Sequence, residues 1–164
     1  MIYYHKFEVR WSDIDANRHL ANSTYVEYCA QTRMAFMTKH KMGVSQLNRW
    51  GIGPVILHER YSFFKEIYAD QNVVVSLEIS GSSEDASIYQ FTHKFYLPDG
   101  THCATAEATG VWIDMMLRKT TNPPDDIVEV MKDFKGENAK LLSREDIKAL
   151  LFRPENVDSN LFEF

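Results

Sequence analysis

The sequence is poor in cysteine and has no long apolar run. Its two cysteines, Cys29 and Cys103, are far apart and show no Cys-x-x-Cys spacing. This excludes a zinc ribbon and a disulfide framework, which need closely spaced or numerous cysteines. No stretch approaches the roughly 18 apolar residues of a membrane span, and no basic segment followed by an apolar one stands at the start. We expect a cytoplasmic protein with reduced thiols, no signal peptide and no membrane contact.

Excess positive charge is also missing. Lys and Arg number 18 against 23 Asp and Glu, which gives a net charge of -5. Proteins that bind nucleic acid need a cationic surface, so nucleic acid is not an expected partner. The seven glycines form no phosphate-binding string. His58 and His93 have no second ligand-like residue at short spacing, so we expect neither a metal nor an organic cofactor.

The remaining composition is that of one globular unit. The chain has 164 residues, of which 45% are hydrophobic and 25% charged. These values are typical of a soluble domain that can bury a core. We expect a single domain over residues 1–122, followed by a helical C-terminal extension over residues 123–164.

The expected domain combines one long helix with a sheet. In residues 2–12, β-branched and aromatic residues alternate roughly with charged ones, which predicts an opening strand. Residues 22–40 contain no Gly or Pro, and the spacing predicts a helix that begins close to residue 23, with Thr24 and Glu27 as a capping box and Asn22 as a competing cap. Its predicted apolar stripe is Val26, Cys29, Ala30, Arg33 and Met37.

In the next part of the chain, apolar side chains recur at every second residue. Strands are predicted over residues 55–64, 73–80, 89–97 and 103–115. The last strand carries small residues on one face, where a helix can approach the sheet closely: Ala104, Ala106, Ala108 and Gly110. The pattern indicates an α+β fold.

Helical spacing returns after Asn122-Pro123-Pro124. One helix is predicted from Asp125 onward, and a second, short one through Leu151, in which Ser143 and Asp146 form the cap. The apolar stripe of this extension suggests that it covers a groove or a neighbouring protomer.

The segment between the first strand and the long helix, residues 13–22, is dense in potential catalytic groups. An extended backbone would place Asp15, Asn17 and His19 on one side, with a carboxylate, an amide and an imidazole facing one space. Such a set can run acyl transfer, and free N–H groups at the start of the helix can polarise a carbonyl. The alternative is structural, because Asp and Asn are common in strand-to-helix loops as caps and Asx turns.

The string Trp11-Ser12-Asp13-Ile14-Asp15-Ala16-Asn17-Arg18-His19-Leu20-Ala21-Asn22-Ser23-Thr24-Tyr25 resembles the catalytic segment of hotdog-fold acyl thioesterases. The likeness is closest to plant-type acyl-ACP thioesterases and looser to the 4-hydroxybenzoyl-CoA thioesterase group, and it covers most of residues 5–120. It implies a hotdog fold, one long helix wrapped by a five- to six-stranded antiparallel sheet. It also implies a homodimer or homotetramer with sites between protomers.

The resemblance places catalytic residues at Asp15, Asn17 and His19, and an acidic one at Glu66. It assigns Asn22 and Tyr25 to substrate binding. The plant-type enzymes have a cysteine directly after the acidic residue, whereas this chain has Ile67. This difference favours a carboxylate that attacks directly or activates water. The bacterial group usually has Gly where this chain has Arg18, so its oxyanion geometry does not carry over.

We therefore expect a thioesterase that hydrolyses acyl-CoA or acyl-ACP in fatty acid metabolism. Asp15 or Glu66 would attack or activate water, and Asn17 and His19 would orient groups and exchange protons. Cys29 and Cys103 are expected to pack in the core rather than act as nucleophiles. The alternative is a non-catalytic hotdog protein that binds acyl thioesters without turnover.

Overall fold

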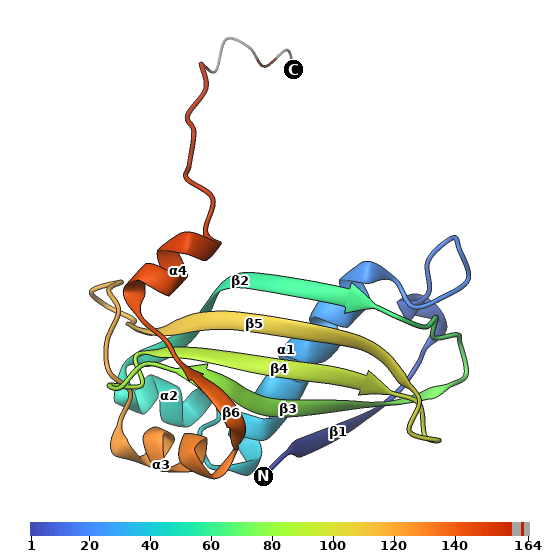
Figure 1. Cartoon of the computed structure of the whole chain (residues 1–164), viewed down its shortest axis with the longest axis horizontal. Helices are drawn as coiled ribbons and strands as arrows, with labels where there is room; N and C mark the ends of the chain where they lie inside the picture. Colours follow the sequence, from blue (N-terminus) through green and yellow to red (C-terminus); the bar gives the residue numbers. More distant parts are fainter. Residues whose placement is uncertain (159–161, 163–164) are drawn as a thin grey trace.

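Helix α1 (Asn22–Lys39) lies against one face of a six-stranded sheet in the computed structural model, which describes residues 1–158 and 162 (Figure 1). Five strands follow one another in the order β1-β3-β4-β5-β2 with antiparallel pairing. The sixth, β6, pairs parallel with β3, on the edge that β1 occupies further along. The α+β hotdog arrangement predicted from the sequence is confirmed. The strands are β1 (Tyr3–Glu8), β2 (Ile52–Phe63), β3 (Asn72–Ser82), β4 (Ile88–Tyr96), β5 (His102–Asp114) and β6 (Lys135–Leu141).

The alternation of apolar and polar residues in the sequence explains why these segments form strands. The predicted apolar face of β3 is fully buried along its length, from Val73 to Ile79. The small residues of β5 are buried too, and Ala104 and Ala106 belong to the same core cluster as Tyr25 of α1. Gly110 serves a different contact, because a Cβ there would lie 2.6 Å from Tyr89 Oη of the neighbouring strand.

Helix α1 begins at Asn22, one residue from the predicted start, but the predicted cap is wrong. Ala21 is the N-cap, and no side chain caps the helix. Thr24 lies inside the first turn, and its hydroxyl donates to the Asp13 carbonyl oxygen at 3.1 Å. The Thr24 hydroxyl, which local spacing assigns to the helix cap, therefore bonds instead to a backbone carbonyl that folding brings close.

The buried face of α1 agrees only in part with the predicted stripe. Cys29 and Met37 are buried as predicted. The buried side chains include Tyr25, Tyr28 and Phe36, whereas Val26 and Met34 remain 40% and 38% exposed. The sheet covers the aromatic side of the helix and leaves an apolar strip open near β2. The ion pair between Arg33, next to Met34 in α1, and Glu59 of β2 shows that this side of the helix is close to that strand.

The segment after β5 contains α3 (Asp125–Asp133), β6 and α4 (Arg144–Leu150). The short helix α2 (Val44–Trp50) lies earlier in the chain, between α1 and β2. Both predicted C-terminal helices are confirmed, including the capping box of Ser143 and Asp146. Strand β6 was not expected, because its polar sequence has no alternation and it forms only by pairing with β3. The end of the predicted extension, residues 159–161 and 163–164, lies outside the described residues.

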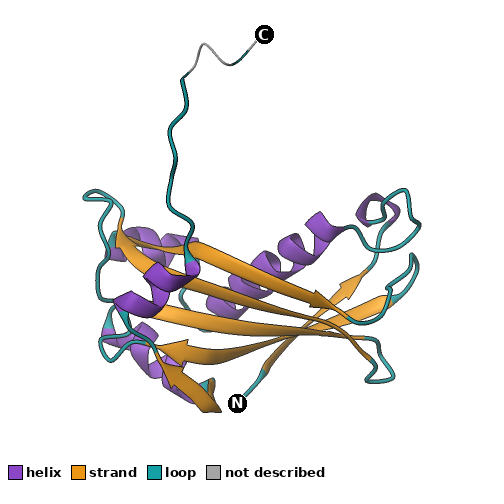
Figure 2. Ribbon diagram, turned by 45° about the horizontal axis from the view of Figure 1, so that its top comes forward, coloured by secondary structure: helices purple, strands orange, loops and turns teal. Residues whose placement is uncertain are grey.

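The two C-terminal helices lie on opposite faces of the sheet (Figures 1 and 2). Helix α3 joins the core cluster of α1, whereas Ile147 of α4 packs with Ile88 and Val111 on the other side. None of the helices in the described residues is long and apolar enough to cross a membrane.

Candidate active site

The segment between β1 and α1 is a tight hairpin rather than an extended chain. Asp15 N donates to His19 O at 3.0 Å, and Arg18 N donates to Asp15 O at 3.0 Å. Arg18 has a φ of 68°, the left-handed conformation that closes the turn. The expectation of an extended backbone is therefore wrong. The hairpin brings Asp15 and His19 together for another reason, because they face each other across its base.

The Asp15 carboxylate lies beside the His19 ring. Asp15 Oδ1 is 3.8 Å from His19 Nδ1, and both side chains are about 30% exposed, at 31% and 27%. The same Oδ1 accepts a hydrogen bond of 2.8 Å from Asn17 N, which orients the carboxylate as in an Asx turn.

Asn17 takes a different position from the one predicted. It is exposed at the tip of the hairpin and does not line the nearby cavity, and its described hydrogen bond uses the backbone N–H. The carboxylate and the imidazole of the predicted trio are adjacent, whereas the amide is at the periphery. The catalytic role assigned to Asn17 by resemblance stays a prediction.

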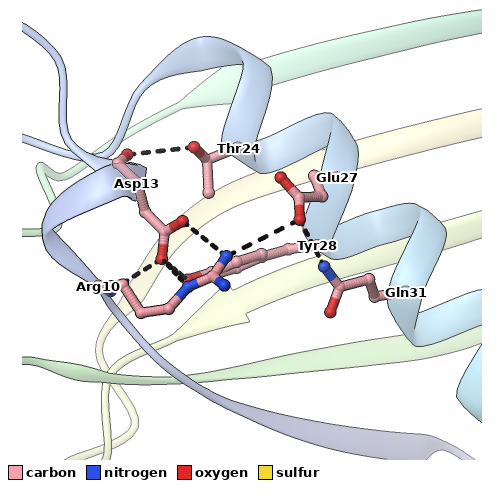
Figure 3. A network of polar contacts seen from close by, with 6 residues as sticks. All are labelled: Arg10, Asp13, Thr24, Glu27, Tyr28 and Gln31. Carbon is pink, nitrogen blue, oxygen red and sulfur yellow. Dashed lines mark hydrogen bonds and ion pairs between the residues drawn. The ribbon is translucent and has the colours of Figure 1, made fainter.

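Asp13 anchors the hairpin to α1 (Figure 3). Its carboxylate accepts bonds from Arg10 Nη2 at 3.0 Å, from Arg10 Nε at 3.2 Å and from Tyr28 Oη at 2.9 Å. Asp13 is only 3% exposed, although it is charged. Burial by itself raises the pKa of Asp13, but the hydrogen bonds from Arg10 and Tyr28 outweigh it and hold the pKa below its usual value.

No local pattern in the sequence marks Asp13, because its Tyr28 partner lies 15 residues away. The structure makes it a positioning residue. It fixes the start of the hairpin against the second turn of α1, and thereby the place of Asp15 and His19.

A cavity of about 340 Å³ opens beside the hairpin. It brings together four of the six predicted site residues, His19, Asn22, Tyr25 and Glu66, from three separate segments. The segment after β2 is tied to the hairpin by a 2.7 Å bond from Leu20 N to Ile67 O. The other lining residues are Leu20, Phe63, Phe64 and Lys65.

Two hydroxyl groups border the acidic side of this cavity. Glu66 is exposed and accepts a hydrogen bond from Tyr68 Oη. Burial raises the pKa of Tyr25 to about 12, with smaller contributions from Cys103 and Glu66. Tyr25 therefore stays protonated at neutral pH, and its hydroxyl can donate a hydrogen bond to a bound oxygen.

The start of α1 supplies backbone donors at the same place. Asn22 is the first helical residue, and it lines the cavity. Because no side chain caps α1, the N–H groups of Asn22 and Ser23 remain available to a ligand. The helix dipole adds a partial positive charge there, which suits an anion that develops on a carbonyl oxygen.

No thiol takes part in this arrangement. Ile67 is fully buried in the core next to Glu66, and neither Cys29 nor Cys103 lines the cavity. Burial raises the pKa of Cys29 to about 12, and it also raises that of Cys103. Within the described residues, no group of three His, Cys, Asp or Glu side chains could hold a metal ion.

Most of the chain matches a known protein family. Residues 9–131 match the family model of the thioesterase-like superfamily. The chain belongs to this superfamily. The matched range includes the hairpin, α1, the four strands β2 to β5 and most of α3. A search of curated proteins finds no significant match.

Solved structures share the fold at low sequence identity. A Staphylococcus aureus hypothetical protein in complex with CoA is 17% identical, with a TM-score of 0.76 over 94% of this chain and 96% of its own. The 1,4-dihydroxy-2-naphthoyl-CoA thioesterase of Synechocystis is 15% identical, with a TM-score of 0.73 over 81% and 97%. A Lactobacillus plantarum protein described as an oleoyl thioesterase is 12% identical, with a TM-score of 0.76 over 100% of this chain and 58% of its own.

Proposed function

We propose that this member of the thioesterase-like superfamily hydrolyses acyl-CoA thioesters to a free acid and CoA. The observation that carries the proposal is the meeting of Glu66 and His19 on one cavity, with the Asp15 carboxylate 3.8 Å from His19 Nδ1. A base, an acid and an orienting carboxylate are the groups that thioester hydrolysis needs. The related S. aureus structure with bound CoA supports CoA, rather than acyl carrier protein, as the carrier.

In this proposal Glu66 accepts a proton from a water molecule whose oxygen attacks the thioester carbonyl carbon. The N–H groups of Asn22 and Ser23 stabilise the resulting oxyanion. When the intermediate collapses, the C–S bond breaks and His19 gives its proton to the thiolate. Asp15, with Oδ1 at 3.8 Å from His19 Nδ1, keeps the ring beside the hairpin for this transfer. Direct attack by Asp15 is the alternative mechanism, and it is less favoured because Asp15 does not line the cavity.

We also propose a homodimer formed through β2. This strand is at one end of the sheet, so its outer edge has unpaired backbone groups. Apolar side chains remain exposed along it and on the open strip of α1, among them Leu57, Phe63, Val26 and Met34. A second copy paired antiparallel to β2 would cover both surfaces, and two such dimers could form a tetramer. The two free, buried cysteines agree with a cytoplasmic location.

The test is CoA release from a panel of acyl-CoA substrates. Glu66→Gln and Asp15→Asn keep shape and remove charge, and Glu66→Gln should lower kcat by about 10²- to 10⁴-fold. The matched controls are Glu84→Gln and Asp70→Asn, which alter carboxylates away from the cavity. Full activity in both active-site variants would refute the assigned roles.

A binding protein without turnover is the second outcome to distinguish. It predicts that acyl-CoA raises the melting temperature of the wild type while no thiol is released. Oxygen esters and acyl carrier protein substrates would then be tested before the proposal of hydrolysis is rejected.

A further inference from the structure

A second cavity, of about 200 Å³, lies between α1 and the sheet. Met34 and Met37 of α1 form one wall, and Phe91 and Trp112 of the sheet form another. Helix α3 closes it with Ile127 and Met131, which are 0% and 6% exposed. The C-terminal segment, and not the sheet alone, thus determines the depth of this cavity.

The lining is mostly apolar. Besides Arg33, it includes Tyr89, whose hydroxyl donates to Val55 O at 3.4 Å, and Trp112, whose buried Nε1 has no hydrogen-bond partner among the described residues. Arg33 is the one charged residue among the described residues that line the cavity. Its charge is already balanced by Glu59, whose Oε1 lies 3.3 Å from Arg33 Nη1. The same Nη1 lies 3.4 Å from Nε2 of the buried His93. A ligand in this cavity is therefore uncharged and largely hydrocarbon, since a buried unpaired charge is costly.

We propose that this cavity holds the acyl group of the substrate, and that Met131 limits it to about six to eight carbons or one aromatic ring. An apolar cavity of about 150 Å³ accommodates benzene, so one of about 200 Å³ has room for little more. A sixteen-carbon chain is excluded unless the cavity opens. This inference rests on the proposed function and names the substrate class of that site.

The proposed dimer explains how the acyl group reaches the cavity. Tyr25, at the first cavity, and Met34, at the second, are nine residues apart in α1, about 13 Å along the helix. In an antiparallel pair of β2 strands, the Phe63 end of one copy meets the Ile52 end of the other. Pro54 lines the apolar cavity and Phe63 lines the polar one. The acyl group would enter the apolar cavity of the second copy.

The first experiment measures kcat/KM for acyl-CoA substrates with chains of four to sixteen carbons and with a benzoyl group. The wild type should prefer six to eight carbons, with hexadecanoyl-CoA at least about tenfold poorer. Met131→Ala removes three heavy atoms from the wall and should move the preferred length up by about two or three carbons. A wild type that prefers sixteen carbons, with no shift in Met131→Ala, would overturn the proposal.

A second variant keeps the test valid if Met131→Ala fails to fold. Ala30 lines the same cavity from α1, so Ala30→Leu fills space and should move the preferred length toward four carbons. The control is Met116→Ala, which truncates a methionine that is 92% exposed and should leave the preference unchanged. Two variants that shift the preference in opposite directions cannot be explained by stability alone.

Binding without hydrolysis separates this inference from the proposed function. S-alkyl-CoA thioethers of the same chain lengths cannot be cleaved, and the increase in melting temperature reports their binding. A maximum at six to eight carbons that moves in Met131→Ala supports the cavity assignment, even if no acyl-CoA is hydrolysed. Equal stabilisation by all chain lengths in wild type and variants overturns it, even if hydrolysis occurs.

Discussion

Tyr28 Oη donates a 2.9 Å hydrogen bond to Asp13 Oδ2, joining the second turn of α1 to the start of the hairpin that carries Asp15 and His19. The contact is buried, and Arg10 covers the carboxylate from the solvent side. This bond links two residues that are 15 positions apart and fixes the start of the hairpin against the side of the helix. The position of Asp15 and His19 depends on it, although neither residue touches Tyr28 or Arg10 in the described contacts.

Asp13→Asn should destabilise the protein by about 2–3 kcal/mol at pH 7, because it removes a buried charge that accepts several hydrogen bonds. The pKa of Asp13 is lowered in the folded state, so its stabilising contribution is complete above the ordinary Asp pKa and is lost as pH falls through the lowered value. The difference between wild type and variant should therefore shrink below about pH 4. Urea unfolding from pH 2.5 to 7 checks this, with Asp126→Asn as an exposed control.

His93 predicts a second pH dependence with its own window. Burial, helped by the Arg33 charge, lowers the pKa of His93 to about 3, against a hydrogen bond between Nδ1 and Ser76 O that raises it. Between about pH 6.5 and 3 the unfolded chain binds a proton that the folded protein does not, so stability falls with falling pH. The slope from this residue approaches about 1.4 kcal/mol per pH unit.

His93→Gln should flatten that part of the stability profile. The substituted amide does not titrate, and it can still donate a hydrogen bond to Ser76 O, so the folded state is retained at neutral pH. Denaturant unfolding of both proteins at intervals from pH 4 to 7 gives the two slopes. Parallel profiles would show that another group causes the acid sensitivity.

Gly110→Ala should lower stability by about 1–3 kcal/mol, because the new methyl group would overlap Tyr89 Oη and the Val55 carbonyl oxygen. Gly43→Ala is the matched control. A Cβ at Gly43 would meet nothing nearer than 3.4 Å, and its backbone conformation suits any residue. Thermal unfolding should show a clear loss for Gly110→Ala and no loss for Gly43→Ala.

His19→Ala and Asn17→Ala should affect turnover unequally. His19 lines the cavity, and its proposed proton transfer contributes about 10²- to 10⁴-fold, whereas Asn17 is exposed outside the lining. Steady-state thiol release from a shared acyl-CoA substrate measures both. An Asn17→Ala variant as impaired as His19→Ala would show that the hairpin closes over the substrate and that the amide acts directly.

Local patterns in the sequence were enough to predict most of the secondary structure. The alternation of Val73, Val75 and Leu77 predicted a strand, and the absence of Gly and Pro over residues 22–40 predicted the long helix. Ser143 and Asp146 predicted their own capping box, because the two partners are three residues apart. These features depend on neighbours in the chain, so they can be predicted before the fold is known.

The pairing of distant segments was decided by tertiary structure. The sequence by itself determined that Asp15 and His19 are in one short segment between a strand and a helix, and that Glu66 has no thiol beside it. Only folding decided that Tyr28 holds Asp13, that β6 pairs with β3, and that Glu66 reaches the His19 cavity. Periodicity tells which side chains share a face, but proximity across the fold depends on how the faces pack.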